Sequence, residues 1–157
     1  MKREEVIPIW NVLDSLGDEK AGVAFSYMVA KNQAAIKDEY ESVMKAIAPT
    51  KAFQKYEELR LEVVRNNATK NEQGQLDMVN GNVIISPDSI DKLKEELEKL
   101  NIEHKDAIEE REAQMKEAEE FFEQEIDLKL EVINMNDFPE TLTPNQMKHL
   151  IQFVKET

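Results

Sequence analysis

The chain has 157 residues, a length that suits one domain, and 41% of them are hydrophobic while 34% are charged. So high a charged fraction is typical of elongated helices, which expose much surface for each residue. The net charge of −13 argues against direct nucleic-acid binding, since no compact basic stripe offsets it. The acidity instead fits a solubility role or a basic protein partner.

The chain has no cysteine, which excludes disulfides and thiolate chemistry. No stretch approaches the roughly 20 apolar residues that a membrane helix needs, and residues 1–5 do not lead into the apolar core of a signal peptide. We therefore expect no membrane contact and a cytoplasmic location.

A short amphipathic helix is predicted over residues 6–16, where Gly17 ends it. Its apolar residues recur three and four positions apart: Val6, Ile9, Trp10, Leu13 and Leu16. Trp10 is the only tryptophan, and it fits either the core or a binding interface.

A long helix is predicted over residues 19–67, with a kink or short break near Pro49. Its stripe, again at three- and four-residue intervals, begins with Phe25, Met28, Asn32, Ile36, Tyr40, Val43 and Ile47. Thr50 is placed to cap the continuation, in which Phe53 and Tyr56 extend the stripe.

Residues 75–85 contain two short β-favouring runs on either side of Asn80-Gly81. Both turn residues tolerate a positive φ, so the pattern predicts a β-hairpin.

A second long helix is predicted over residues 88–124, after Ser86 and Pro87. Its seam follows a 3-4 spacing over about five heptads: Ile90, Leu93, Leu97, Leu100, His104, Ala107, Arg111, Met115, Ala118 and Phe122. The polar pair His104 and Arg111 either fixes the coiled-coil register or splays to reach water. Residues 88–125 hold 15 acidic and 6 basic residues, a net charge of −9, so the outer face is acidic.

After Phe122 the hydrophobic period changes to alternation, which predicts a strand over residues 126–133 with one buried face. Thr143, Pro144 and Gln146 form a helix-start signature, so a closing helix is predicted over residues 144–156.

Together these elements predict a mainly α-helical single domain spanning residues 1–157. The two long helices form an antiparallel coiled-coil hairpin, with the β-hairpin at its tip and a small α/β base. A lone strand is not stable, so strand 126–133 needs a partner. The candidates are the first few residues, the same strand of another copy, or a strand of another protein.

Three surfaces are predicted to bind a partner. The hairpin carries more apolar side chains than an isolated tip can bury, the helix–strand junction pairs glutamates with an aromatic residue, and the strand has an unpaired edge. Core packing is the alternative role of Phe121 and its neighbour Phe122. The candidate residues are Leu76, Met78, Val83 and Ile85 in the hairpin, Glu119, Glu120 and Phe121 at the junction, and Ile126, Leu128 and Leu130 in the strand.

Catalysis is not expected. The two histidines, His104 and His149, share no motif, and there is no nucleophile elbow or glycine-rich phosphate loop. The glutamates that follow His104 match no metal-ligand spacing, and the simpler interpretation is that they form a solvated face of the helix. We expect neither a cofactor nor a metal.

The order of elements, with Ala30-Lys31-Asn32 in the first long helix, the alternating run from Glu125 to Val132 and the closing segment from Leu142 to Val154, resembles small accessory proteins of tailed bacteriophages. Those proteins often begin with a strand, and this N-terminus is too short for one. The resemblance implies a non-enzymatic phage protein in the cytoplasm of a bacterial host, or associated with the virion. It would act by protein binding, in virion assembly or by inhibiting a host factor.

The plan of two helices joined by a hairpin also resembles a prefoldin subunit, from which the added strand and closing helix depart. This resemblance implies the alternative, a chaperone-like or structural coiled-coil subunit that works as a homo-oligomer.

Overall fold

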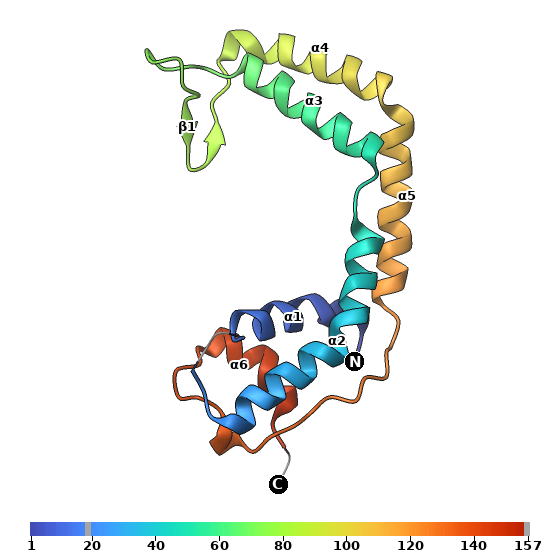
Figure 1. Ribbon diagram of the computed structural model, residues 1–157. Coiled ribbons are helices and arrows are strands. Elements are labelled where there is room, and N and C mark those ends of the chain that lie inside the picture. The colour runs from blue at the N-terminus through green and yellow to red at the C-terminus, as the bar shows by residue number, and fades with distance from the viewer. Residues whose placement is uncertain (18–19, 156–157) are drawn as a thin grey trace. The chain divides into compact units, whose positions relative to one another are not determined.

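The computed structural model describes residues 1–17 and 20–155. It confirms a mainly helical chain with a small two-stranded antiparallel sheet (Figure 1). The elements in chain order are the 3-10 turn η1 (Arg3–Glu5), the helices α1 (Val6–Ser15), α2 (Val23–Ile47) and α3 (Lys51–Asn67), the strands β1 (Met78–Val79) and β2 (Asn82–Val83), the helices α4 (Pro87–Glu103) and α5 (Lys105–Phe122), the turn η2 (Met135–Asp137), the helix α6 (Pro144–Leu150) and the turn η3 (Ile151–Phe153).

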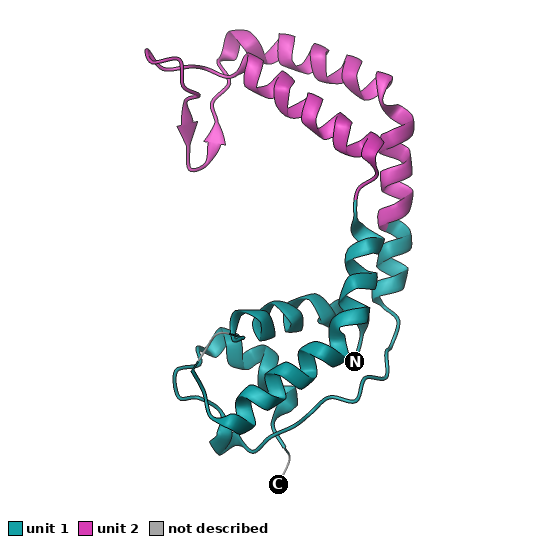
Figure 2. Ribbon diagram, in the orientation of Figure 1, with its two compact units in different colours: residues 1–48, 116–157 teal, residues 49–115 magenta. Residues whose placement is uncertain are grey.

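The chain divides into two compact units, where the sequence predicted one domain (Figure 2). Unit 1 combines residues 1–48 with residues 116–157, and unit 2 is the continuous stretch 49–115. Pro49 stands at the first boundary, where α2 has ended and α3 has not begun. Because proline lacks an amide hydrogen and disfavours a helical conformation of the preceding residue, it separates the two helices there.

The core of unit 1 lies where α1, α2 and α6 meet. Buried side chains from all three helices and from the C-terminal turn form it: Val6, Ile9, Leu13, Phe25, Met28, Ile36, Leu150 and Phe153. Trp10 is half-buried against this cluster, and its ring stacks on Tyr40 with centroids 4.5 Å apart. Trp10 thus packs within unit 1, which agrees with the core alternative for this residue.

The segment 126–133, predicted as a strand, is extended backbone with no sheet ladder. Its ends meet different partners, because Lys2 bridges Glu125 in antiparallel fashion and Ile133 bridges Val154 in parallel fashion. Between these bridges the segment lies on helices, and among the described residues no strand lies beside it to complete a ladder. The alternation still identifies the buried face as far as Leu130, and then it shifts, since Val132 is exposed and Ile133 is buried.

Asn32 replaces the missing strand partner in the middle of this segment. Its side chain is fully buried on α2; Nδ2 donates to the Glu131 carbonyl at 3.0 Å, and Oδ1 accepts from the Glu131 amide at 2.7 Å. A side-chain amide thereby pairs both backbone groups of one residue, as a neighbouring strand would. Asn32 therefore satisfies polar groups that would be costly to bury unpaired.

In unit 2, α3 and α4 pack as an antiparallel pair. The Tyr56 hydroxyl donates to Asn101 Oδ1, near the end of α4, at 2.8 Å. Asn67, the last residue of α3, donates through Nδ2 to Glu96 Oε2, near the middle of α4, at 2.6 Å. Asn67 is buried and also donates to the Val63 carbonyl, which ties the end of α3 to its own last turn. The coiled-coil arrangement of the full-length helices stays a prediction.

The helix predicted over 88–124 is divided in the structure at His104, between α4 and α5. His104 has φ −107° and ψ 21°, outside the helical region, and its ring lies 5.9 Å from that of Tyr56. The division falls at a position of the predicted seam that is occupied by the polar ring of His104, whereas the three seam positions immediately before it are leucines. The predicted helix 19–67 is likewise two helices, and its predicted first residue, Glu19, lies outside the described residues.

Local sequence signals explain several helix boundaries. Thr50 Oγ1 accepts from the Phe53 amide, and Thr143 and Gln146 form the predicted capping box at the start of α6. Pro87 occupies the first turn of α4. The predicted closing helix 144–156 is shorter, because α6 ends at Leu150 and continues as a 3-10 turn; Glu156 lies outside the described residues.

Replacing Asn32 with alanine tests the role of its paired hydrogen bonds. We expect Asn32→Ala to lower the free energy of unfolding by about 2–3 kcal/mol, because two backbone groups lose their partner. Urea denaturation followed by Trp10 fluorescence measures this, since the only tryptophan lies in unit 1. Asn11→Ala, on the exposed side of α1, is the control and should change the value by about 0.5 kcal/mol or less. Equal effects of the two substitutions would contradict the assignment.

Candidate binding surfaces

The predicted β-hairpin is present in unit 2 and is built on a two-residue turn. Met78 pairs with Val83 and Val79 with Asn82, while Asn80 and Gly81 take positive φ values of 51° and 82°. Two consecutive positive φ angles are the signature of a type I′ turn, whose twist matches that of the strands. The sequence signal Asn-Gly therefore specified the turn.

The hairpin rests on a small network of backbone hydrogen bonds. The Ile84 amide donates to the Asp77 carbonyl and the Asp77 amide to the Thr69 carbonyl, each at 2.9 Å. The Thr69 amide in turn donates to the Ile84 carbonyl at 2.8 Å. Residues 68–70 thus lie beside the hairpin and connect it to the end of α3.

We define the tip surface as the apolar side chains of this hairpin: Leu76, Met78, Val79, Val83, Ile84 and Ile85. Met78 and Val79 are 57% and 56% exposed, and Ile84 is 39% exposed. Leu76, Val83 and Ile85 are half-buried. Residues 78–86 contain no charged side chain, and Asp77 is the one charged residue between Leu76 and Ile85.

The two polar seam residues lie against aromatic rings of α3. His104 is half-buried near Tyr56, and the Arg111 guanidinium carbon lies 5.6 Å from the centre of the Phe53 ring. Arg111 also donates to Gln114 Oε1 at 2.7 Å. Their predicted role in fixing register stays a prediction.

At the helix–strand junction, Phe121 and Phe122 are both half-buried, while Glu119 and Glu120 are exposed. The Arg3 guanidinium carbon lies 4.1 Å from the centre of the Phe121 ring, and Arg3 Nε lies 2.8 Å from Glu39 Oε2. Arg3 thereby covers one face of this ring by a cation–π contact. Phe121 therefore makes contacts within unit 1. The exposed residues of this candidate binding surface are Glu119 and Glu120.

Ile126, Leu128 and Leu130, predicted to offer a free strand edge to a partner, are packed against the unit 1 core. The backbone beside them is also engaged. The Ile126 amide donates to the Met1 carbonyl at 2.9 Å, and further along Glu131 is paired by Asn32. The first few residues, one of the three predicted partners, therefore pair with the start of this segment. Binding of another protein at Ile126, Leu128 and Leu130 stays a prediction.

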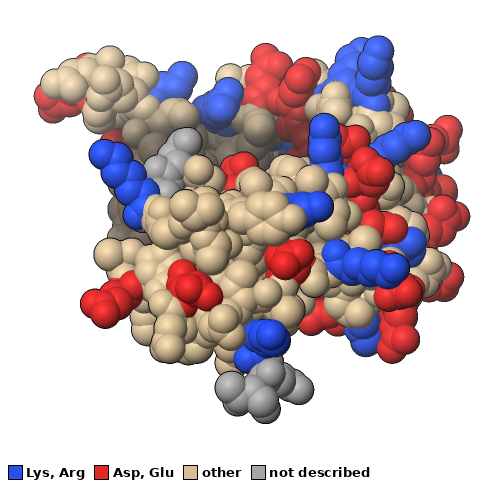
Figure 3. Space-filling model, turned by 60° about the horizontal axis from the view of Figure 1, so that its bottom comes forward, with Lys and Arg blue, Asp and Glu red and all other residues tan. Residues whose placement is uncertain are grey.

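The acidic outer face of α4 and α5 is a solvated surface with local ion pairs. Lys99 Nζ lies 2.7 Å from Glu95 Oε1, and this hydrogen bond lowers the pKa of Glu95 and raises that of Lys99. Lys92–Glu96 and Lys105–Glu109 are further pairs at the same four-residue spacing. Figure 3 shows Lys and Arg lying among Asp and Glu on the face in view. Such exposed pairs contribute little to stability and select no ligand.

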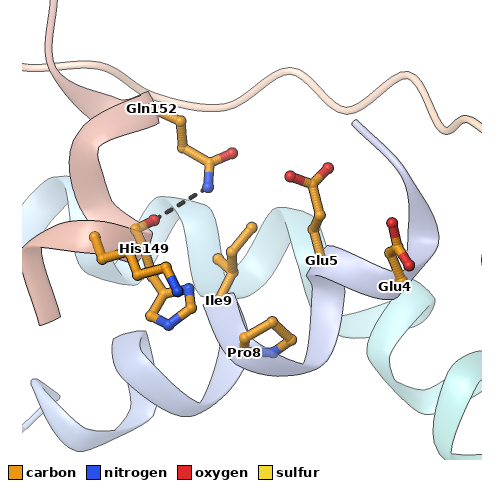
Figure 4. A pocket seen from close by; sticks show the side chains of 7 residues that line it. Glu4, Glu5, Pro8, Ile9, His149 and Gln152 are labelled. Atoms are coloured by element: carbon orange, nitrogen blue, oxygen red, sulfur yellow. Dashed lines mark hydrogen bonds between the residues drawn. The ribbon is translucent and has the colours of Figure 1, made fainter. Parts of the chain in front are cut away.

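A polar pocket of about 380 Å³ lies between the start of α1 and the α6–η3 segment (Figure 4). Glu4, Glu5 and Pro8 line one side, and His149 and Gln152 the other. Gln152 Nε2 donates to the His149 carbonyl at 3.1 Å. Lys148 adds a positive charge to the same lining, so the mixed signs favour no single class of ligand. Among the described residues, no three His, Cys, Asp or Glu side chains gather as a metal site would require.

A second pocket, of about 370 Å³ and lined mostly by apolar residues, was not anticipated from the sequence. Met135, Phe138, Pro139, Leu142 and Met147 line it, together with Asn136 and Glu140. All the lining residues except Met147 lie in a turn-rich part of residues 135–147 with neither helical nor strand periodicity, so the sequence did not predict the pocket. Only the pair of methionines within this stretch was a usable signal.

The chain matches no protein-family model, no curated protein and no solved structure. Over the residues that the structure describes, no helix combines the length and apolarity needed to cross a membrane.

The turn of the hairpin provides a test of the tip geometry. We expect Gly81→Ala to destabilise the hairpin by about 1 kcal/mol, because its φ of 82° disfavours a side chain with Cβ. Gly81→Asn should cost less, because asparagine tolerates this conformation. Amide hydrogen exchange at Ile84 measures the effect, with about fivefold faster exchange expected for alanine. Identical exchange in both variants would argue against the turn described here.

Proposed function

We propose that the chain is a non-enzymatic protein that binds another protein through the tip surface. The observation that carries this proposal is the exposure of Met78 and Val79, more than half in each case. Because consecutive side chains of a strand point to opposite faces, the hairpin exposes an apolar side chain on each face. Single exposed apolar side chains are common, but their exposure on both faces of a hairpin whose residues 78–86 carry no charge favours a contact surface.

The backbone of the hairpin adds a second source of affinity. The sheet has two strands, so each has one neighbour and one outer edge. A partner strand can add to such an edge, with main-chain hydrogen bonds providing affinity and alternate side chains providing specificity. The outer edge and the exposed Met78 and Val79 would then serve the same partner.

The phage resemblance supplies the biological setting of this proposal. The chain would be a phage-encoded accessory protein in the bacterial cytoplasm, and its partner a virion component or a host factor that it inhibits. The net charge of −13 supports a protein partner over nucleic acid, because the phosphate backbone repels an acidic surface.

The alternative is a chaperone-like or structural coiled-coil subunit that works as a homo-oligomer. The antiparallel packing of α3 against α4 supports this plan, since Tyr56 pairs with Asn101 and the later Asn67 pairs with the earlier Glu96. The mass of the purified protein by light scattering separates the two proposals. A defined oligomer that forms alone favours the alternative, and a monomer favours capture of a different protein.

The double substitution Met78→Ser/Val79→Ser tests the tip surface. Immobilised wild-type protein and the variant are incubated with lysate of the native host, and the retained proteins are compared by mass spectrometry. We expect a protein held by the wild type to be reduced at least about tenfold with the variant, because two apolar anchors are lost.

Val23→Ser is the matched control, because Val23 is 88% exposed on α2 in unit 1. It removes an exposed apolar side chain without altering the tip surface, so retention should be unchanged. If both variants retain the same proteins as the wild type, the tip surface is not the contact.

A further inference from the structure

The apolar pocket beside α6 lies wholly in unit 1, far along the chain from the tip surface. We call it the methionine pocket, after Met135 and Met147 on its lining. Met135 is 58% exposed, while Phe138, Leu142 and Met147 are half-buried. Its volume of about 370 Å³ is at the lower end of the range for ligand sites, which suits a single large side chain.

The walls of this pocket are held from several directions. Phe138 packs edge-on against the buried ring of Phe25, with centroids 5.6 Å apart. The Leu142 amide donates to the Pro139 carbonyl at 3.4 Å, and the capping box of Thr143 fixes the start of the helix that carries Met147. These contacts hold the lining residues in place, so the pocket is part of the folded structure of unit 1.

The lining of the pocket carries one charged residue, the exposed Glu140. Asp137, beside Phe138 in the chain, is exposed and acidic, and Lys148, after Met147, is exposed and basic. Unit 1 as a whole has 18 acidic and 10 basic residues, a net charge of −8. A pocket lined mostly by apolar residues, with Glu140 on its lining in an acidic unit, suits a segment that is itself apolar at one point and basic around it.

We propose that the methionine pocket binds one large apolar side chain of a basic peptide segment of another protein. The methionine side chains adapt to the shape of the inserted group, because they are unbranched and polarizable. Glu140, on the lining, and Asp137 then pair with lysine or arginine residues that flank the anchor. This site is separate from the tip surface, so it does not depend on the function proposed there.

A synthetic peptide tests the site directly on the intact chain. The probe is a short, fluorescently labelled alanine-based peptide with one central phenylalanine and lysines on both sides, and binding is measured by anisotropy. We expect replacement of the phenylalanine by alanine to weaken binding at least about tenfold. Replacement of the lysines by glutamates should abolish it. Equal binding of the phenylalanine and alanine peptides would overturn the proposal, because charge alone would then explain the association.

A pair of charge reversals locates the contact. Glu140→Lys should weaken binding about fivefold more than Glu98→Lys, which makes the same change in net charge at an exposed position of α4 in unit 2. Circular dichroism confirms that both variants remain folded. Equal weakening by the two reversals would place the peptide elsewhere.

The seven methionines provide an independent readout that does not rely on substitution. In a protein labelled with ¹³C at the methionine methyl groups, peptide addition should shift the Met135 and Met147 signals and leave Met78 unchanged. A shift of Met78 without the other two would overturn this proposal while leaving the tip surface as a binding site.

Discussion

Unit 1 depends on how the extended segment 124–133 satisfies its backbone. A buried amide or carbonyl without a partner costs as much as a lost hydrogen bond. Within residues 1–17 and 20–155 no strand lies beside this segment to supply partners. Three unrelated parts of the chain provide them instead. Residues 1–3 pair with its start, the side chain of Asn32 pairs with Glu131, and residues 153–155 pair with Ile133. Both chain ends described by the structure are thereby fastened to one segment.

Unit 2 satisfies the same requirement locally. Its helices α3 and α4 follow each other along the chain, and the hairpin between them closes through hydrogen bonds among residues 69, 77 and 84. Its buried side chains lie on helices α3, α4 and α5. The hydrogen bonds of Tyr56 and Asn67 align α3 with α4. The exposed tip surface is the part of this unit that its own packing does not use.

Local sequence signals predicted much of this fold. The Asn80-Gly81 turn, the Thr143 capping box and the break near Pro49 each follow from the conformational preference of one or two residues, and the structure contains all three. Alternation after Phe122 identified the inward side chains as far as Leu130, yet it could not specify what lies beside the backbone. A side chain 99 residues away, Asn32, provides the pairing that a strand was expected to provide.

The candidate sites were also predictable only where they depend on residues close together in the sequence. Exposed hairpin residues were predictable, because a short apolar loop cannot bury its own side chains. The strand residues were assigned to a partner because nothing in their neighbourhood in sequence could cover them, while the helices that do cover them are distant in the chain. The methionine pocket depends on Phe25, far from the residues 135–147 that line it, and therefore had no local pattern.

The order of the two units along the chain has a consequence for synthesis. Unit 2 is continuous, so residues 49–115 have all their internal partners as soon as they leave the ribosome. Unit 1 cannot close until residues 116–155 emerge, because contacts such as Arg3 with Gln124 join positions 121 residues apart. During that interval the apolar faces of α1 and α2 have only each other for cover. Unit 2 thus folds before unit 1 during synthesis. The risk of aggregation is greatest while residues 116–157 are being translated.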